Sequence, residues 1–142
     1  MQLTAEEMSL IANSYEEAKK QVMEKYAMTS IEVDVMLFLA NNPQFDTAAE
    51  IVSIRKIAKS HVSLAVSRLE QRGFLARIRD EKDRKKHHLC IQESASEMVR
   101  DGQEFQKSFR EKMLSGFTEE EKRQMSTFVE RIAENLRQRN SK

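Results

Sequence analysis

The sequence is poor in residues that interrupt or cross-link a chain. Its 142 residues include one cysteine, one proline, three glycines and no tryptophan. The single thiol, Cys90, excludes an internal disulfide and any metal site built only from cysteines of one chain. The scarcity of glycine and proline, with no low-complexity tract, argues against extended disorder. The chain is long enough to form one domain with its own hydrophobic core.

Long hydrophobic runs are also missing. No apolar stretch approaches the ~18 residues that indicate a membrane-spanning helix. The N-terminus, Met-Gln-Leu-Thr-Ala-Glu-Glu, carries acids where a secretory signal carries Lys or Arg. We therefore expect a soluble, cytoplasmic protein.

Overall charge is small, but it is unevenly distributed. The formal net charge is +1, from 24 basic and 23 acidic residues. Between Arg55 and His88 there are eleven Lys or Arg and four Asp or Glu, a balance of +7, and the rest of the chain carries −6. All three histidines fall in the same segment. A basic segment of this kind attracts polyanions that the net charge alone would not predict.

Helix starts are marked by a repeated capping box. In this motif a Ser or Thr hydroxyl accepts from a free backbone N–H, and a Glu placed three residues later reaches back to the cap residue. The pattern precedes an apolar run at Thr4/Glu7, Thr29/Glu32, Thr47/Glu50, Ser94/Glu97 and Thr118/Glu121. We therefore expect a mainly helical protein.

Long amphipathic helices are predicted at both ends of the chain. Apolar residues recur at helical spacing over 4–26 and on both sides of Gly116. We expect 1–27 and 94–142 to form the dimerisation helices of a homodimer, around a smaller lobe over 30–92. A monomeric bundle, in which these helices fold back on their own chain, is the alternative. The apolar residues expected to need a partner chain are Met8, Ile11, Tyr15, Phe128, Ile132 and Leu136.

The lobe over 30–92 has the order of a winged helix-turn-helix. A buried helix over 31–40 is followed by a short helix over 47–54 and the turn Arg55-Lys56-Ile57. A second helix then runs to Arg72, and Gly73 closes it in a left-handed cap.

The second helix of this motif has a polar face suited to a DNA groove. A helical wheel points Ser60, Leu64, Ser67 and Gln71 away from its apolar face. Small hydroxyls, an amide and one aliphatic side chain suit close approach to base edges. The alternative is an ordinary solvent-exposed face. It is the weaker interpretation, because two strands joined by a basic loop, the wing, follow this helix.

Two strands joined by a basic loop follow the second helix. The run 74–79 alternates Phe74, Ala76 and Ile78, assigned to the core face, with Leu75, Arg77 and Arg79, and Leu89 and Ile91 mark the inward face of the return strand. The loop over 80–86 has four cations within five positions, a density that favours phosphate and minor-groove contact over a solvated tip.

These residues resemble the MarR (multiple antibiotic resistance regulator) family of winged-helix transcription factors. The likeness is carried by 63–77, similar to the family's recognition helix and the strand after it, and by Asp83-Arg84-Lys85, where the family has Asp-x-Arg at the wing tip. Lys85 stands in place of the arginine and loses its planar fork. With helices on both sides, the resemblance covers 1–142 as a single MarR-like domain.

The resemblance implies a homodimer that binds a pseudo-palindromic operator. It also leaves room for a small-molecule effector in a cleft where the dimer helices meet the DNA-binding lobe. We therefore expect a sequence-specific, double-stranded DNA-binding regulator of transcription, acting as a homodimeric repressor with its recognition helix in the major groove and its wing in the minor groove. The residues expected to contact DNA are Arg55, Lys59, Ser60, His61, Ser63, Leu64, Ser67, Arg68, Lys82, Arg84, Lys85 and Lys86.

Two other classes of protein are less well supported. A helical module that binds RNA or protein without operator specificity is the alternative, but the basic segment has no exposed aromatic platform for it. An enzyme is disfavoured by the absence of nucleotide-binding, metalloprotease and Ser/His/Asp motifs. We therefore expect no catalytic residue, no cofactor and no metal. His88 and Cys90 share one strand face near Arg77, and an inert, partly covered thiol is predicted there.

Overall fold

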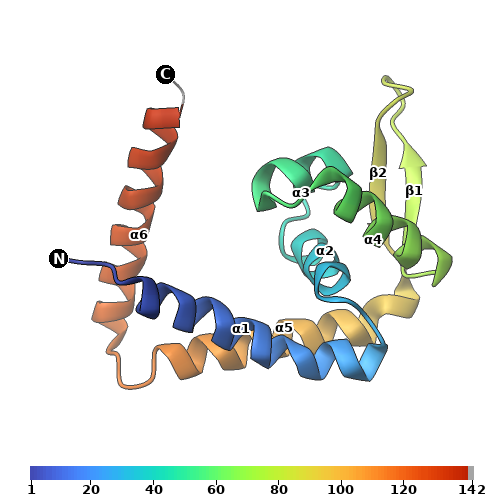
Figure 1. Ribbon diagram of the computed structural model, residues 1–142. Coiled ribbons are helices and arrows are strands. Elements are labelled where there is room, and N and C mark those ends of the chain that lie inside the picture. Colours follow the sequence, from blue (N-terminus) through green and yellow to red (C-terminus); the bar gives the residue numbers. More distant parts are fainter. Residues whose placement is uncertain (141–142) are drawn as a thin grey trace. The chain divides into compact units, whose positions relative to one another are not determined.

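The computed structural model describes residues 1–140 (Figure 1). It divides into two compact units, Met1–Lys107 and a second that begins at Ser108. The elements are the helices α1 (Ala5–Tyr26), α2 (Ser30–Asn41), α3 (Ala48–Arg55), α4 (Lys59–Gln71), α5 (Ser96–Met113) and α6 (Glu119–Asn140), the strands β1 (Leu75–Arg79) and β2 (His87–Ile91), and the 3-10 turn η1 (Glu93–Ala95). The chain is therefore a mainly helical winged helix-turn-helix, as the sequence predicted.

Four of the five predicted caps begin a helix. Thr4 and Thr47 each accept from the backbone three residues on, and Thr29 and Thr118 form full reciprocal boxes with Glu32 and Glu121. The prediction that Ser94 caps the start of a helix was wrong. Ser94 lies inside η1 and its hydroxyl donates to the Gly73 carbonyl oxygen at 2.7 Å, so α5 starts only at Ser96.

Helix α2 is the centre of the first unit. Every residue from Glu32 to Leu39 is buried, and α1, α4 and β2 all contact this helix (Figure 1). Its sequence is apolar nearly all round, which is the pattern of a helix without a solvent face. The prediction of a central buried helix is confirmed.

A buried ammonium group joins α1 to α2. The Lys19 side chain is 0% exposed, and its Nζ lies 2.7 Å from Glu16 Oε1, 2.8 Å from Asp34 Oδ1 and 2.8 Å from the Ser30 hydroxyl. A buried cation is tolerated only when its hydrogen bonds and charge are satisfied in this way. The contact therefore fixes the two helices relative to each other by polar geometry as well as by apolar packing.

Helix α1 also packs along the first part of α5. The rings of Tyr15 and Phe105 lie 5.2 Å apart, and Asp101 accepts from both Lys25 Nζ at 2.7 Å and the Tyr26 hydroxyl at 2.5 Å. Burial and the bond to Asp101 raise the pKa of Tyr26 to about 12. The predicted exposure of Tyr15 in a monomer was wrong, because its ring is half-buried against α5.

The two strands form an antiparallel hairpin beside α4 (Figure 1). Leu75 pairs with Ile91 and Arg77 with Leu89, so these four share one face of the sheet. Leu75 and Leu89 are buried, whereas Ile78 is 54% exposed. The assignment of Ile78 to the core face was therefore wrong: Leu75 faces inward, and Phe74 packs on the core from just before the strand.

In the second unit, α6 presents apolar side chains on its surface. Phe128, Val129, Ile132 and Leu136 are each at least half exposed. Glu119 pairs with Lys122 at 3.2 Å, and Glu120 pairs with Arg123, so the first turns are stabilised by local charge. The amphipathic pattern predicted for this helix is confirmed. Among the helices within 1–140, none combines the length and the apolar character that crossing a membrane requires.

Gly102 of α5 marks a point where two helices come close. A Cβ atom there would lie 2.5 Å from Leu37 Cδ2 and 3.2 Å from Leu37 Cγ, and Leu37 is itself only 2% exposed. Gly102→Ala should lower the free energy of unfolding by about 1–2 kcal/mol, since overpacking outweighs the gain in helix propensity. Urea denaturation would measure this change.

The matched test combines that substitution with Leu37→Ala. Removing the Leu37 methyl groups opens the space that the methyl group added at position 102 needs, so the double variant should lose less stability than the two single losses added together. Strictly additive losses would contradict the proposed clash.

Candidate nucleic-acid interface

The turn between α3 and α4 is closed by a residue in left-handed conformation. Lys56 has φ 56°, and its backbone N–H donates to the Val52 carbonyl oxygen at 3.0 Å. This conformation is unfavourable for residues with a Cβ, and it ends α3 at Arg55. Two residues later Ala58 is the N-cap of α4, which starts at Lys59, and this gives the short connection of a helix-turn-helix.

Helix α4 has the two faces that its sequence predicted. Val62, Ala65, Val66 and Leu69 are buried. Ser60, Leu64, Ser67 and Gln71 are exposed on the opposite side, with Leu64 at 52%. Leu64 is an aliphatic side chain in the middle of this polar face, and a side chain of this kind can meet a thymine methyl group in the major groove.

All twelve side chains nominated for DNA contact are exposed. They come from three places: the last residue of α3, the outward side of α4, and the loop between β1 and β2. Arg55 is anchored from behind by Asp34 Oδ2, 3.8 Å from its guanidinium. The exposure of these side chains meets a requirement for DNA contact.

Acidic side chains shape the wing loop. Asp80 Oδ2 accepts from the backbone N–H of Lys82 at 3.0 Å and of Asp83 at 2.9 Å, and Asp83 Oδ1 accepts from the N–H of Lys85 at 3.0 Å. These carboxylates bind the backbone of the loop. Within residues 1–140, none of the cations Lys82, Arg84, Lys85 and Lys86 forms an ion pair. Their charge is therefore left for an external anion.

A histidine bridge at the base of the wing was missed by sequence reasoning. His88 Nδ1 lies 2.7 Å from Asp46 Oδ1, and His88 Nε2 lies 2.7 Å from Asp80 Oδ1. The bonds to Asp46 and Asp80 raise the pKa of His88. The His88 ring and two backbone N–H donors lower the pKa of Asp80 to about 2. No sequence signal marks this bridge, because Asp46 is 42 residues from His88 and no local motif joins them.

Arg77 faces away from His88. In the register of the hairpin, Arg77 pairs with Leu89 and its Nε donates to Glu70 Oε1 of α4 at 2.6 Å. His88 and Cys90 share the other face, with Ile78 and Ala76. The predicted proximity of Arg77 to the histidine and the thiol was therefore wrong. Cys90 is a free, half-buried thiol, and among residues 1–140 no group of three or more His, Cys, Asp or Glu is placed to hold a metal.

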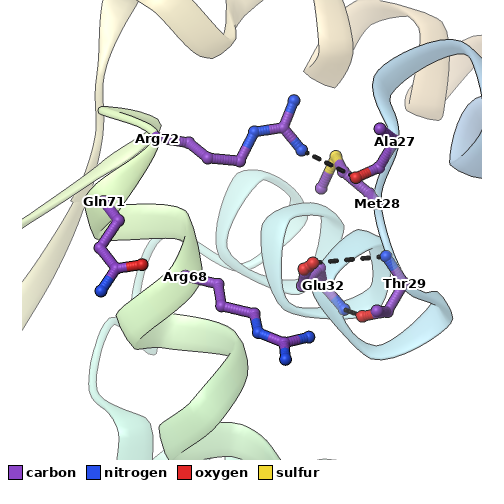
Figure 2. A pocket seen from close by; sticks show the side chains of 7 residues that line it. All are labelled: Ala27, Met28, Thr29, Glu32, Arg68, Gln71 and Arg72. Carbon is purple, nitrogen blue, oxygen red and sulfur yellow. Dashed lines mark hydrogen bonds between the residues drawn. The ribbon is translucent and has the colours of Figure 1, made fainter.

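A cleft of about 480 Å³ opens between the α1–α2 connection and the last turns of α4 (Figure 2). Arg72 donates to the Ala27 carbonyl oxygen at 3.1 Å across one side of it. Glu32 is 4% exposed, and its Oε2 is buried without a hydrogen-bond partner in the described part of the chain. Arg68, one of the nominated DNA contacts, lines the same cleft. The cleft therefore reaches one of the residues nominated for DNA contact.

A winged helix-turn-helix with a solvent-facing second helix and a cationic wing is a DNA-binding architecture. Residues 28–86 match the sequence model of the MarR family. This segment runs from the end of α1 through the whole helix-turn-helix to the last cation of the wing loop. Over this segment the chain is similar to the MarR family.

A curated relative and solved structures extend the similarity beyond this segment. The chain is 25% identical over 131 residues to the HTH-type transcriptional regulator PecS of Dickeya dadantii strain 3937, covering 91% of this chain and 79% of PecS. A Listeria monocytogenes protein of the MarR family, solved with a 26mer DNA, superposes with a TM-score of 0.84 at 18% identity, covering 96% and 90% of the two chains. The MepR–DNA complex of S. aureus gives 0.74 at 18% identity, with 94% and 96% covered. At these identities the structural likeness establishes the fold.

Proposed function

We propose that this chain is a sequence-specific regulator of transcription that binds double-stranded DNA as a homodimer and acts as a repressor in the cytoplasm. Helix α4 would enter the major groove, and the wing loop over 80–86 would lie along the minor groove. The observations that carry the proposal are the wing cations, which form no ion pair within residues 1–140, and the exposed polar face of α4. That two proteins of the same fold were crystallised with DNA supports it.

Three groups of residues would have different roles in the complex. Arg55, Lys59 and His61 lie at or near the start of α4 and would hold phosphates, which gives affinity without sequence preference. Along the exposed side of α4, Ser60, Ser63, Leu64 and Ser67 would face base edges, with Arg68 on the flank. Lys82, Arg84, Lys85 and Lys86 would contact phosphates and the minor groove from the wing.

The homodimer would cover apolar side chains that a single chain leaves in water. Met8 and Ile11 of α1 are both more than half exposed, as are Phe128 and Leu136 of α6. Patches of this kind on soluble proteins mark interaction surfaces. A two-fold dimer would present two copies of α4 about 34 Å apart, one turn of DNA, to a pseudo-palindromic site.

An RNA-binding role is the alternative that an experiment should address first. Duplex DNA and RNA of matching sequence would compete for the purified protein, with the bound fraction of each measured. Preference for DNA is expected, because the basic segment has no exposed Phe, Tyr or Trp ring on which single-stranded bases would stack. Preference for RNA would overturn the proposal.

Replacing both Arg84 and Lys85 with Ala tests the wing. Each dimer should lose two to four phosphate or minor-groove contacts, so the slope of log affinity against log salt should become shallower by about 2 to 4, at about 0.9 per contact. Specific and random duplexes should weaken alike. The control removes two exposed cations outside the basic segment, Lys20 and Lys107, and should leave the slope unchanged. An unchanged slope in the wing variant would show that the loop is a solvent-exposed turn whose cations do not contact DNA.

Leu64→Ala tests base reading by α4. Loss of the side chain should relax the preference at one operator position by about 1 kcal/mol and leave the salt slope as it was. The comparison is Lys59→Ala, which should weaken operator and random DNA equally. Affinity for every single-base variant of a selected operator would be measured with both proteins. Uniform weakening by Leu64→Ala would contradict the assignment.

Sedimentation at micromolar concentration tests the homodimer. The parent should sediment as a species of twice the 16.6 kDa of one chain. Ile132→Glu should shift it toward monomer, since a buried unpaired carboxylate is costly at an interface. The matched control, Glu130→Gln, changes an exposed charge two residues away in the same helix and should remain dimeric. A persistent 16.6 kDa parent would contradict the dimer.

A further inference from the structure

His88 joins three segments of the first unit that are separate in sequence. The ring belongs to β2 and contacts Asp46 in the connection before α3 and Asp80 at the start of the wing loop, each at 2.7 Å. A backbone bond from Leu89 N–H to the Asp46 carbonyl oxygen, 2.7 Å long, runs beside it. The bridge therefore lies where the wing meets the helix-turn-helix.

We propose that His88 is a positioning residue for DNA binding: its imidazolium ring, held between Asp46 and Asp80, fixes the wing loop in its DNA-binding shape, and DNA affinity falls when the ring loses a proton. The proposal rests on the proposed function as a DNA-binding regulator. It concerns a residue that would not itself touch DNA.

The geometry requires the protonated ring. A neutral imidazole has one N–H donor and one nitrogen lone pair. Both ring nitrogens of His88 lie at hydrogen-bond distance from a carboxylate oxygen, which can only accept. A neutral ring would therefore turn a lone pair toward one of the two carboxylates. Only the imidazolium donates to Asp46 and Asp80 together.

Few other groups bear on this ring. Asp46 comes from the connection that precedes α3, and Asp80 comes from the wing loop. The residue across the hairpin from His88 is Ile78, which carries no charge. Asp46 and Asp80 are also the charged groups that act on the pKa of His88, while partial burial opposes them. The state of the bridge therefore follows the proton on His88.

Asp80 connects the His88 ring to the loop that carries the cations. One carboxylate oxygen of Asp80 binds the His88 ring, and the other accepts from the backbone N–H groups of Lys82 and Asp83. The Asp80 N–H also donates to the Lys86 carbonyl oxygen at 3.0 Å. A turned or released Asp80 would remove the contacts that shape the loop. The loop cations would then no longer be presented in one arrangement.

The direction of the pH dependence follows from the two pKa shifts. The pKa of His88 is raised above 6.5, so its contribution is complete below that value and is lost as pH rises through the raised pKa. The pKa of Asp80 is lowered from 3.8 to about 2, so its contribution is present above 3.8 and is lost only as pH falls toward 2. The bridge is thus intact in mild acid and opens on the alkaline side.

The experiment follows DNA affinity and ring protonation over the same pH series. The full-length parent, His88→Gln and the neighbouring His87→Gln would be titrated with one selected duplex at constant ionic strength from about pH 5.5 to about pH 8.5. At the acid end the parent and His87→Gln should bind about three- to tenfold more tightly than His88→Gln, the exposure of the bridge limiting the effect. At the alkaline end the three affinities should converge. His61 is present in all three proteins, so its effect on DNA affinity cancels in the ratio.

A second variant and a direct measurement guard against misfolding. Asp80→Asn keeps the size of the side chain and should lose affinity at acid pH as His88→Gln does. NMR would follow the His88 ring and the exchange of the Lys82 and Asp83 amide protons in the free protein, with exchange speeding up as the ring deprotonates.

The outcomes separate this proposal from the proposed function. A constant affinity ratio between parent and His88→Gln at every pH would overturn the positioning role, even if DNA binding is strong. A parent without preference for duplex DNA at any pH would overturn the regulator proposal instead. In that case the NMR titration still tests whether protonation of His88 orders the wing loop. Amide exchange that is independent of His88 protonation would overturn the positioning role.

Discussion

The burial of α2 is the constraint on which the rest of the first unit depends. A helix that is apolar nearly all round must be covered on every side, and α1, α4 and β2 share that task. Each covering element then turns its remaining face outward. For α4, the residues left outside include hydroxyls, an amide, Leu64 and basic side chains, and for the hairpin they include the loop of cations. The surface proposed for DNA is thus the reverse side of the packing around α2.

Charge in this chain is divided between scaffold and surface. Asp34, Asp46 and Asp80 each hold a positively charged or donor group in place: Asp34 binds Lys19 and Arg55, and the other two bind His88. In the described chain, the wing cations have no such partners. A net charge of +1 therefore conceals a protein in which three aspartates hold the scaffold together and the wing cations stay unpaired within the described residues. Counting charges along the sequence located the basic segment, but only the structure shows which charges are already engaged.

Local features were predictable from sequence, and long-range ones were not. Thr29, Thr118 and Gly73 determine helix ends through bonds to residues within one turn, so their patterns could be read directly. Ser94 carries the same pattern but donates to Gly73 instead, a partner 21 residues away. Alternation showed that the hairpin has two faces, yet the choice of Leu75 over Ile78 as the inward residue depends on how the sheet meets α4. The His88 bridge unites residues from three separate segments, and spacing gives no sign of it.

Asp46 has a position that links the wing to the first helix of the helix-turn-helix. It directly precedes Thr47, the cap of α3, and it holds β2 through both its side chain and its carbonyl oxygen. Fixing a residue in one backbone conformation costs about 1–2 kcal/mol in conformational entropy, and here that cost is met when the chain folds. DNA would then meet a wing and a helix that are already ordered together. The free energy of binding DNA would then come from released counterions, and little of it would be needed to order the protein.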